Sequence, residues 1–387
     1  MLATADDIQI NFSSESTYDA EMSFVQLRGL LAQCARKFKD EPTLLRVNYP
    51  VMIVGDLHGQ YKDLLRILGL SSSKTVDVAK DIKRYIFLGD YVDRGPDAIP
   101  CLITLMQLKV KHPKSYNLLR GNHETETINE KYGFKSEINR RYTKNFEQKI
   151  LFREFNDMFA WIPIAALISN RILCMHGGIS PRLNSLADIE RIERPLLNVF
   201  SVPLAGNLMW SDPAHIETNY SFNTVRGVSC FFSEKAVIDT CNRLNLDFIV
   251  RGHQVMNNGY WFFAGTKMIT VFSAPRYSAD SKGAVMVINK NKEFGFVFLA
   301  PTEKLSTEKA FKDKFDYLDR LQYGEDLNFC KNADKSVDTQ GEFSRSMSSR
   351  VDGDDSRNDG TDNKRSKKNG PIKETNKRGN SKRKSRR

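Results

Sequence analysis

The stretch Gly89-Asp90-Tyr91-Val92-Asp93-Arg94-Gly95 follows an apolar run at 85–88, which predicts a short buried strand ended by a glycine. Two carboxylates and an arginine fall together between Asp90 and Arg94. A carboxylate is a hard oxygen ligand for a cation, and an arginine presents a planar fork that matches a phosphate. The stretch therefore favours phosphoryl chemistry at the end of a strand.

The same pattern recurs at the ends of four other strand-like runs. The polar residues that follow these runs are Gly55-Asp56-Leu57-His58-Gly59, Arg120-Gly121-Asn122-His123-Glu124, His176-Gly177-Gly178 and Arg251-Gly252-His253. Helical spacing of apolar residues separates the runs in the first half of the chain, whereas strand-like runs dominate the second half. Ligand sites in α/β sheets lie beyond the strand ends, so we expect the five loops to converge on one site.

Four of the six histidines stand at these strand ends, namely 58, 123, 176 and 253. Asp56 and His58 offer an oxygen and an imidazole two residues apart, and the two oxygens of Asp90 can bridge two cations. Asn122, His176 and His253 would complete a second site. Mixed donors of this kind suit Mn, Fe or Zn rather than Ca. Two such metals, about 3.5–4 Å apart, can hold and deprotonate a water for in-line attack on phosphorus.

Two further groups are required for that reaction. Arg94 can hold phosphate oxygens, and His123 can protonate the leaving oxygen, with Asp93 orienting it and raising its pKa. The alternative for Arg94 and Asp93 is a structural ion pair in a turn, and a single histidine in a loop is ordinarily a surface residue.

The motifs together carry a family resemblance. The three blocks that begin at Gly55, Gly89 and Arg120 resemble the signature blocks of the eukaryotic serine/threonine phosphoprotein phosphatases. The similarity covers roughly residues 25–302, and within the family the chain looks most like the type-one protein phosphatases. Further matching blocks are Tyr132-Gly133-Phe134, His176-Gly177-Gly178, Trp210-Ser211-Asp212-Pro213, Arg226-Gly227-Val228-Ser229 and Ser273-Ala274-Pro275.

The resemblance implies an α/β fold with a central β-sandwich of mixed sheets flanked by helices, the calcineurin-like metallophosphoesterase fold, in a single catalytic domain. It implies a dinuclear metal centre of Mn, or Fe and Zn, with His123 as proton donor and Asp93 behind it. Arg94, Arg226 and Tyr277 match phosphate-contacting positions, and only the resemblance supplies the last two. One metal is assigned Asp56, His58 and Asp90, and the other Asp90, Asn122, His176 and His253.

The chain departs from the family pattern at two places. It reads Arg276-Tyr277-Ser278 where the family usually has Asn-Tyr-Cys, which removes a thiol that cyclic-peptide toxins can trap and adds a charge at the rim. The type-one enzyme also has a hydrophobic groove for regulatory peptides. Its positions match Ile172, Phe248, Phe262, Phe294 and Phe296, but Lys292 replaces an apolar residue there. A β-sheet core would use the same apolar residues.

The formal charge of +11 belongs to the end of the chain. Residues 363–387 hold 12 Lys/Arg and one acid, so the other 362 residues are balanced overall. We expect three regions: a flexible arm at 1–22, the catalytic domain at 23–304, and a disordered extension at 305–387. The basic end could bind an import receptor or, weakly, polyanions, or it could be a solvated tail without a receptor.

No window approaches the eighteen apolar residues of a membrane span, and no secretory signal is visible at the N-terminus. The six scattered cysteines favour a reducing compartment, so we expect the nucleus or the cytoplasm. The sequence thus predicts a metal-dependent protein serine/threonine phosphatase that acts by direct attack of a metal-held hydroxide. The rivals are a metallophosphodiesterase for nucleotides and a scaffold that has lost catalysis.

Overall fold

The computed structural model describes residues 22–72, 79, 82–278 and 281–301. The predicted arm, apart from Met22, and the whole of the predicted extension lie outside these ranges. All described residues belong to one compact unit. None of the described helices has the length and apolar character that crossing a membrane requires.

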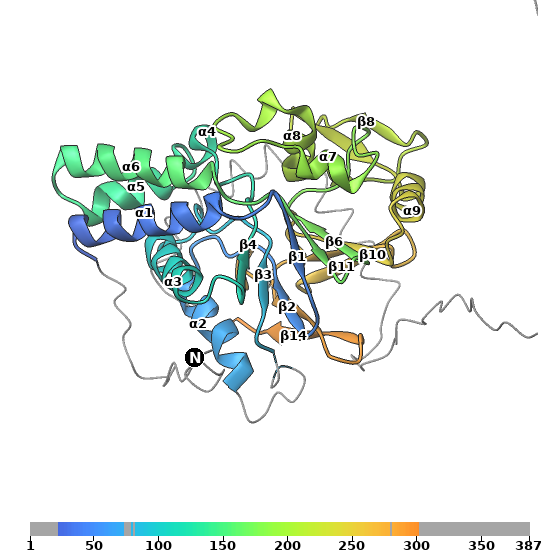
Figure 1. Cartoon of the computed structure of the whole chain (residues 1–387), viewed down its shortest axis with the longest axis horizontal. Coiled ribbons are helices and arrows are strands. Elements are labelled where there is room, and N and C mark those ends of the chain that lie inside the picture. The colour runs from blue at the N-terminus through green and yellow to red at the C-terminus, as the bar shows by residue number, and fades with distance from the viewer. Residues whose placement is uncertain (1–21, 73–78, 80–81, 279–280, 302–387) are drawn as a thin grey trace, which may run out of the picture. The chain divides into compact units, whose positions relative to one another are not determined.

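Two mixed sheets form the centre of the fold (Figure 1). The five-stranded sheet has the order β14-β13-β2-β3-β4, and the six-stranded sheet has the order β1-β5-β6-β10-β12-β11. The strands of the first sheet are β2 (Val51–Val54), β3 (Tyr85–Phe87), β4 (Tyr116–Leu118), β13 (Gly283–Ile288) and β14 (Phe294–Leu299). Those of the second are β1 (Leu44–Val47), β5 (Ala165–Ile168), β6 (Ile172–Met175), β10 (Phe248–Arg251), β11 (Tyr260–Phe263) and β12 (Met268–Val271).

The buried strands send alternate side chains to two different cores, because successive residues of a strand point to opposite faces. In β2, Val51 and Ile53 enter a cluster that also contains residues of β1, β5, β6, β10 and β12. Met52 and Val54 enter a second cluster, formed with helices. The first cluster therefore lies between the two sheets and makes them a sandwich, as predicted.

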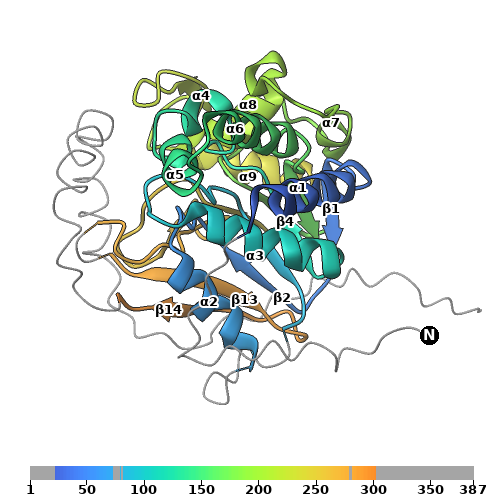
Figure 2. The same cartoon turned by 90° about the vertical axis from the view of Figure 1, so that its left-hand side faces the viewer.

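Helices cover both outer faces of the sandwich (Figures 1 and 2). The five-stranded sheet packs against α1 (Phe24–Lys39), α2 (Tyr61–Gly69), α3 (Ala98–Lys111), α5 (Phe134–Arg141) and α6 (Asn145–Phe159). The six-stranded sheet packs against α7 (Leu186–Glu190), α8 (Pro203–Trp210) and α9 (Glu234–Arg243). A short helix, α4 (Glu126–Asn129), follows β4 after a tight turn. The predicted α/β architecture with flanking helices is confirmed.

Several elements carry weak sequence signals, and we did not predict them. β1 and β5 are four-residue strands, and a third sheet of order β7-β9-β8 has strands of two or three residues. Its strands are β7 (Asp212–Pro213), β8 (Tyr220–Phe222) and β9 (Cys230–Phe232). Runs this short show no periodicity, so their pairing with distant strands decides their conformation. The described cysteines, 34, 101, 174, 230 and 241, are all buried and free.

A buried lysine joins three segments near the end of α3. The Lys109 side chain is fully buried and its ammonium donates to Glu41, to Pro113 O at 3.1 Å and to Tyr116 O at 2.9 Å. Burial lowers the pKa of Lys109, and the carboxylate of Glu41 opposes that shift. A buried charge of this kind is tolerated only while all its partners remain.

Replacing this lysine should therefore destabilise the domain. We expect Lys109→Met to lower the free energy of unfolding by about 3 kcal/mol, because Glu41 and the two carbonyls lose their donor in the interior. Urea denaturation followed by circular dichroism measures the change. Lys111→Met, at an exposed position of the same helix, is the matched control and should change the free energy by less than about 0.5 kcal/mol. Equal effects of the two substitutions would contradict the interpretation.

Candidate functional site

The ends of the parallel strands meet at one edge of the sandwich. β2, β3 and β4 run parallel to one another, as do β6, β10 and β12 in the other sheet. Hydrogen bonds and close contacts join the two groups of strand ends. The His253 backbone N–H donates to Asp56 Oδ1 at 3.0 Å, and a parallel bridge joins Asp56 to Phe272. The loops that the sequence placed after five different strands therefore share one buried centre.

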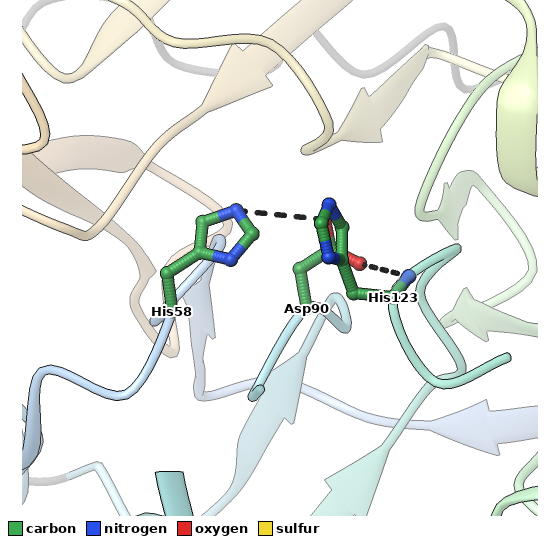
Figure 3. A group of neighbouring side chains, drawn as sticks. All are labelled: His58, Asp90 and His123. Atoms are coloured by element: carbon green, nitrogen blue, oxygen red, sulfur yellow. Dashed lines mark hydrogen bonds and ion pairs between the residues drawn. The ribbon is translucent and has the colours of Figure 1, made fainter. Parts of the chain in front are cut away.

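Asp90 lies in the middle of this centre. Its Oδ2 is 3.3 Å from His176 Nε2, 3.6 Å from His58 Nε2 and 3.9 Å from His123 Nε2. Its Oδ1 accepts the His123 backbone N–H at 2.9 Å. Figure 3 shows His58 and His123 approaching the Asp90 carboxylate from two different loops. One carboxylate thus has imidazoles on several sides, which is the arrangement that a bridging ligand requires.

A second group of acceptor atoms forms beside Asp90. Asn122 Oδ1 is 2.8 Å from His176 Nε2 and 2.9 Å from His253 Nδ1, and these two ring nitrogens are 3.1 Å apart. His176 Nδ1 lies 3.1 Å from Leu88 O, which can only accept. The Nδ1 atom therefore carries a proton, and in the neutral ring Nε2 turns its lone pair toward Asn122.

His58 is oriented in the same manner. Its Nδ1 is 3.0 Å from Val92 O, so that its Nε2 lone pair faces Asp90. The same Nε2 atom is 3.8 Å from Asp56 Oδ2. A backbone carbonyl that fixes the tautomer in this manner is a usual partner of a metal-binding histidine.

The donor set fits divalent metals. Ligand-capable atoms of His58, Asp90 and His123 lie within 4.8 Å of one another, and so do those of Asp90, His176 and His253. Lone pairs crowded this closely in a buried place repel one another unless positive charge lies between them. Imidazole, carboxylate and amide oxygen together suit Mn, Fe or Zn.

The electrostatics follow from burial and from this crowding. Burial raises the pKa of Asp56 to about 6, with His176 opposing the shift, and burial together with His123 lowers the pKa of His58 to about 3. Burial favours the protonated form of Asp90, but His176 and His123 outweigh it and lower the pKa of that carboxyl. The site thus holds Asp90 as a carboxylate and His58 as a neutral ligand.

His123 and Asp93 form a pair at the edge of the centre. His123 Nδ1 is 2.6 Å from Asp93 Oδ2, and Asp93 Oδ1 accepts the Phe134 backbone N–H at 2.9 Å. Burial alone would lower the pKa of His123, but Asp90 and then Asp93 outweigh it and raise that pKa. With Nδ1 directed at Asp93, Nε2 faces the metal-ligand side.

The two predicted arginines and Tyr277 flank the same centre. The Arg94 guanidinium lies 4.6 Å from the centroid of the Tyr132 ring, and its charge contributes to the pKa of both His58 and His123. Arg226 donates from Nη2 to His253 O at 3.3 Å. The Tyr277 ring centroid is 5.1 Å from that of His58. The structure therefore brings together all eleven residues that the sequence selected.

Two acids hold these groups in place and were given no role from the sequence. The fully buried Glu124 accepts the backbone N–H groups of Asp90 at 2.8 Å, Tyr91 at 2.8 Å and Gly121 at 3.0 Å. In the sequence, Glu124 stood out only by its position directly after His123 in the third block. By accepting these bonds it fixes the turn from which Asp90 projects.

Asp212 fixes two arginine side chains, those of Arg226 and Arg251. It accepts Arg226 Nε at 2.9 Å and Arg251 Nη2 at 2.9 Å, and it is buried. Burial would raise the pKa of Asp212, but Arg226 and Arg251 outweigh it and hold that pKa below its usual range. In the sequence, Asp212 stood out only as part of the Trp210-Ser211-Asp212-Pro213 block, which does not indicate which residues it contacts.

The residues predicted for a peptide groove divide into two groups. Ile172 and Phe248 are buried between the sheets, whereas Phe262, Phe294 and Phe296 are half-buried. The latter belong to β11 and β14, which are the edge strands of their sheets. Lys292 is exposed in the turn before β14, with φ +67°. Three of the five positions therefore have surface to offer a ligand.

Comparisons with known proteins agree with this geometry. The family model of the calcineurin-like phosphoesterases matches residues 49–257. Serine/threonine-protein phosphatase PP1-delta of Caenorhabditis elegans is 41% identical over 281 residues, which cover 72% of this chain and 88% of that protein. Another serine/threonine-protein phosphatase of the same organism is 40% identical over 276 residues, 71% of this chain and 58% of its own length.

A solved structure gives the same fold. A protein serine/threonine phosphatase from Saccharomyces cerevisiae, described as similar to human phosphatase PP5, superposes with a TM-score of 0.63 at 27% identity. The superposition covers 74% of this chain and 92% of that chain.

The role of Glu124 can be tested through metal affinity. We expect Glu124→Gln to weaken Mn²⁺ binding about 10–100-fold, because an amide nitrogen cannot accept the N–H groups that orient Asp90. Titration calorimetry of metal-free protein measures the affinity. Glu126→Gln, which changes an exposed acid two residues away, should leave it within about twofold. Unchanged affinity in Glu124→Gln would show that the turn is fixed by other contacts.

Proposed function

Since the chain belongs to the calcineurin-like phosphoesterases and, among them, to the serine/threonine protein phosphatases, a metal-dependent hydrolase family, we propose that it removes phosphate from phosphoserine and phosphothreonine of proteins. The reaction is a direct in-line attack of water on phosphorus, without a phosphoenzyme. The observation that carries the proposal is the arrangement of two acceptor clusters that share Asp90, next to the His123–Asp93 pair.

Six residues would hold two divalent metal ions. Asp56, His58 and Asp90 would hold one, and Asp90, Asn122, His176 and His253 the other. Bound there, the ions would supply positive charge for the phosphate oxygens and lower the pKa of the attacking water. Mn, or Fe and Zn, agrees with the donor set.

The protein's own side chains then bind and orient the phosphate. Arg94 acts electrostatically on His58 and His123, and Arg226 donates to His253 O, so both arginines lie beside the histidine cluster. Their guanidinium groups match phosphate oxygens. Asp212 keeps Arg226 in place by accepting from its Nε, which leaves its terminal nitrogens directed toward the site. The Tyr277 ring lies beside His58 and its hydroxyl can donate to the same phosphate.

His123 acts as the general acid. Asp93 accepts from Nδ1, so the proton that is transferred leaves from Nε2 to the serine or threonine oxygen as the ester bond breaks. Burial would lower the pKa of His123, but Asp90 and Asp93 outweigh it and raise that pKa, which favours the protonated form that a general acid needs. Asp93 is itself immobilised by the Phe134 N–H, so the imidazole has one orientation.

The reaction class is tested by comparing two substrates. With Mn²⁺, we expect a larger kcat/KM for a phosphoserine peptide than for a phosphodiester such as bis(4-nitrophenyl) phosphate. His123→Ala should lower kcat on the peptide by about 10²–10⁴-fold, since the serine alkoxide is a poor leaving group without an acid. The phosphate release rate measures both effects.

Two outcomes would contradict the proposal. A preference for the diester would indicate a nucleotide phosphodiesterase, and a full set of bound metal without turnover of either substrate would indicate a scaffold. Unchanged kcat in His123→Ala, with His215→Ala at an exposed site as control, would refute the role of the acid alone.

We further propose that regulatory peptides bind along the edge strands β11 and β14. The rings of Phe262 and Phe296 are 6.0 Å apart and those of Phe294 and Phe296 are 6.3 Å apart, so they form a continuous apolar strip. An extended peptide could pair with the outer edge of β14, which pairs with no other strand among the described residues, and place alternate side chains on this strip. Lys292 favours a peptide with an acidic residue at that end. Loss of peptide affinity in Phe296→Ser is the test, and unchanged affinity would refute it.

For the basic end of the chain we propose nuclear import. Lys364-Arg365-Ser366-Lys367-Lys368 and Lys382-Arg383-Lys384-Ser385-Arg386-Arg387 are two clusters of the kind that import receptors bind. Residues 363–387 fused to an inert reporter should concentrate it in nuclei. An even distribution would refute import through this segment.

A further inference from the structure

Arg276 occupies an unusual position in the loop between β12 and β13. Its φ is +65°, in the left-handed region that costs an ordinary side chain about 1 kcal/mol or more. Its backbone N–H donates to Ser281 O at 2.9 Å, which closes the turn. The sequence suggested that this arginine adds a charge at the rim of the site, yet its side chain is only 18% exposed. It is turned inward.

The Arg276 guanidinium faces a buried acid on α2. Arg276 Nη2 is 3.8 Å from Asp63 Oδ2, and the Asp63 side chain is 1% exposed. Asp63 Oδ1 accepts Arg66 Nη1 at 2.6 Å, but Oδ2 has no hydrogen-bond donor among the described residues. A buried carboxylate oxygen in this state is costly unless a positive charge lies beside it. Arg66 supplies such a charge at Oδ1, and Arg276 supplies a second one at Oδ2.

The neighbouring residue points to the candidate site. Tyr277 packs against His58, with ring centroids 5.1 Å apart, and against Phe272, at 5.3 Å. His58 and Asp63 lie only five residues apart, at the turn into α2 and within that helix. Arg276 and Tyr277 therefore contact the same segment at two points, one through charge and one through a ring.

We propose that the ion pair between Arg276 and Asp63 is a clamp that positions Tyr277 against His58. Arg276 is a positioning residue, because it acts on the site through Tyr277. The residue after β14 is connected to the same pair. Arg66 donates both to Ala300 O, at 3.0 Å, and to Asp63, which in turn faces Arg276. Its effect on substrate rests on the proposed function, whereas its effect on the loop does not.

Four variants test the clamp. Arg276→Asn removes the charge and introduces a residue that tolerates positive φ. Arg276→Lys keeps the charge. Asp63→Asn and the variant with both asparagines complete a double-mutant cycle. The control is Lys282→Asn, which removes an exposed charge from the same loop. Amide hydrogen exchange of residues 272–278, in metal-free and Mn²⁺-loaded protein, reports on the loop. KM and kcat on a phosphoserine peptide report on the site.

The expected result has a defined pattern. Both single asparagine variants should accelerate loop exchange and raise KM by about 3–10-fold, a change equivalent to roughly 1 kcal/mol, while kcat changes less than about twofold. The double variant should be no worse than the more affected single variant, because the pair is already broken. Arg276→Lys should recover part of the loss, and Lys282→Asn should match the wild type.

Other outcomes would overturn the clamp. If Arg276→Asn has the hydrogen exchange and the KM of the wild type, the ion pair does not position the loop. If the effects add in the double variant, the two residues act independently. A fall in kcat together with loss of bound Mn²⁺ would assign Arg276 to the stability of the metal site instead. If Asp63→Asn does not fold, the two Arg276 variants alone decide. If the wild type releases no phosphate from the peptide, the proposed function fails, and hydrogen exchange still decides on the clamp.

Discussion

The structure depends on one electrostatic constraint, the concentration of hydrogen-bond acceptors around the buried Asp90. Two imidazole nitrogens lie within 3.6 Å of its carboxylate, and Asn122 and His253 face His176 at similar distances. These atoms are buried, so the surrounding protein must hold them in place, and a cation bound between them would compensate their lone pairs. The strands, their parallel order and the glycines at their ends all serve that requirement.

The backbone at the site is held in conformations that it would not adopt alone. His58, Asp90, Asp93, Arg94 and His253 all have positive φ. Glycines next to them leave no room for a side chain: a Cβ on Gly121 would lie 2.2 Å from Asp90 Oδ1, and one on Gly252 would lie 2.5 Å from Asp56 Oδ1. Glu124 stabilises the strained turn through three backbone N–H groups. Strain of this kind persists only where the surroundings over-determine it, and such places are commonly functional.

Several residues of this centre are held in place by a second residue. Three residues for which we propose a role in the reaction, Arg94, Arg226 and His123, each contact a second residue. These partners are the Tyr132 ring, Asp212 and Asp93, in that order. Each of these partners belongs to a different segment of the chain, so the site is stabilised by the tertiary structure as a whole. The pair of Arg276 and Asp63 has the same form, with Tyr277 in the outer position.

The sequence by itself selected the candidate residues at the strand ends, because each block is local: a short apolar run, a glycine, and two or three polar residues that leave the strand end together. The family resemblance added Arg226 and Tyr277. It could not determine the short strands β1 and β5, the support that Glu124 and Asp212 give, or the burial of Ile172 and Phe248 between the sheets, since these depend on contacts between residues far apart in the chain. Arg276 illustrates the difference. Its charge is written in the sequence, but only the left-handed turn after β12 and the position of α2 direct that charge inward to Asp63. Local patterns fix chemistry and secondary structure, whereas the direction of a side chain is decided by the partners that folding brings to it.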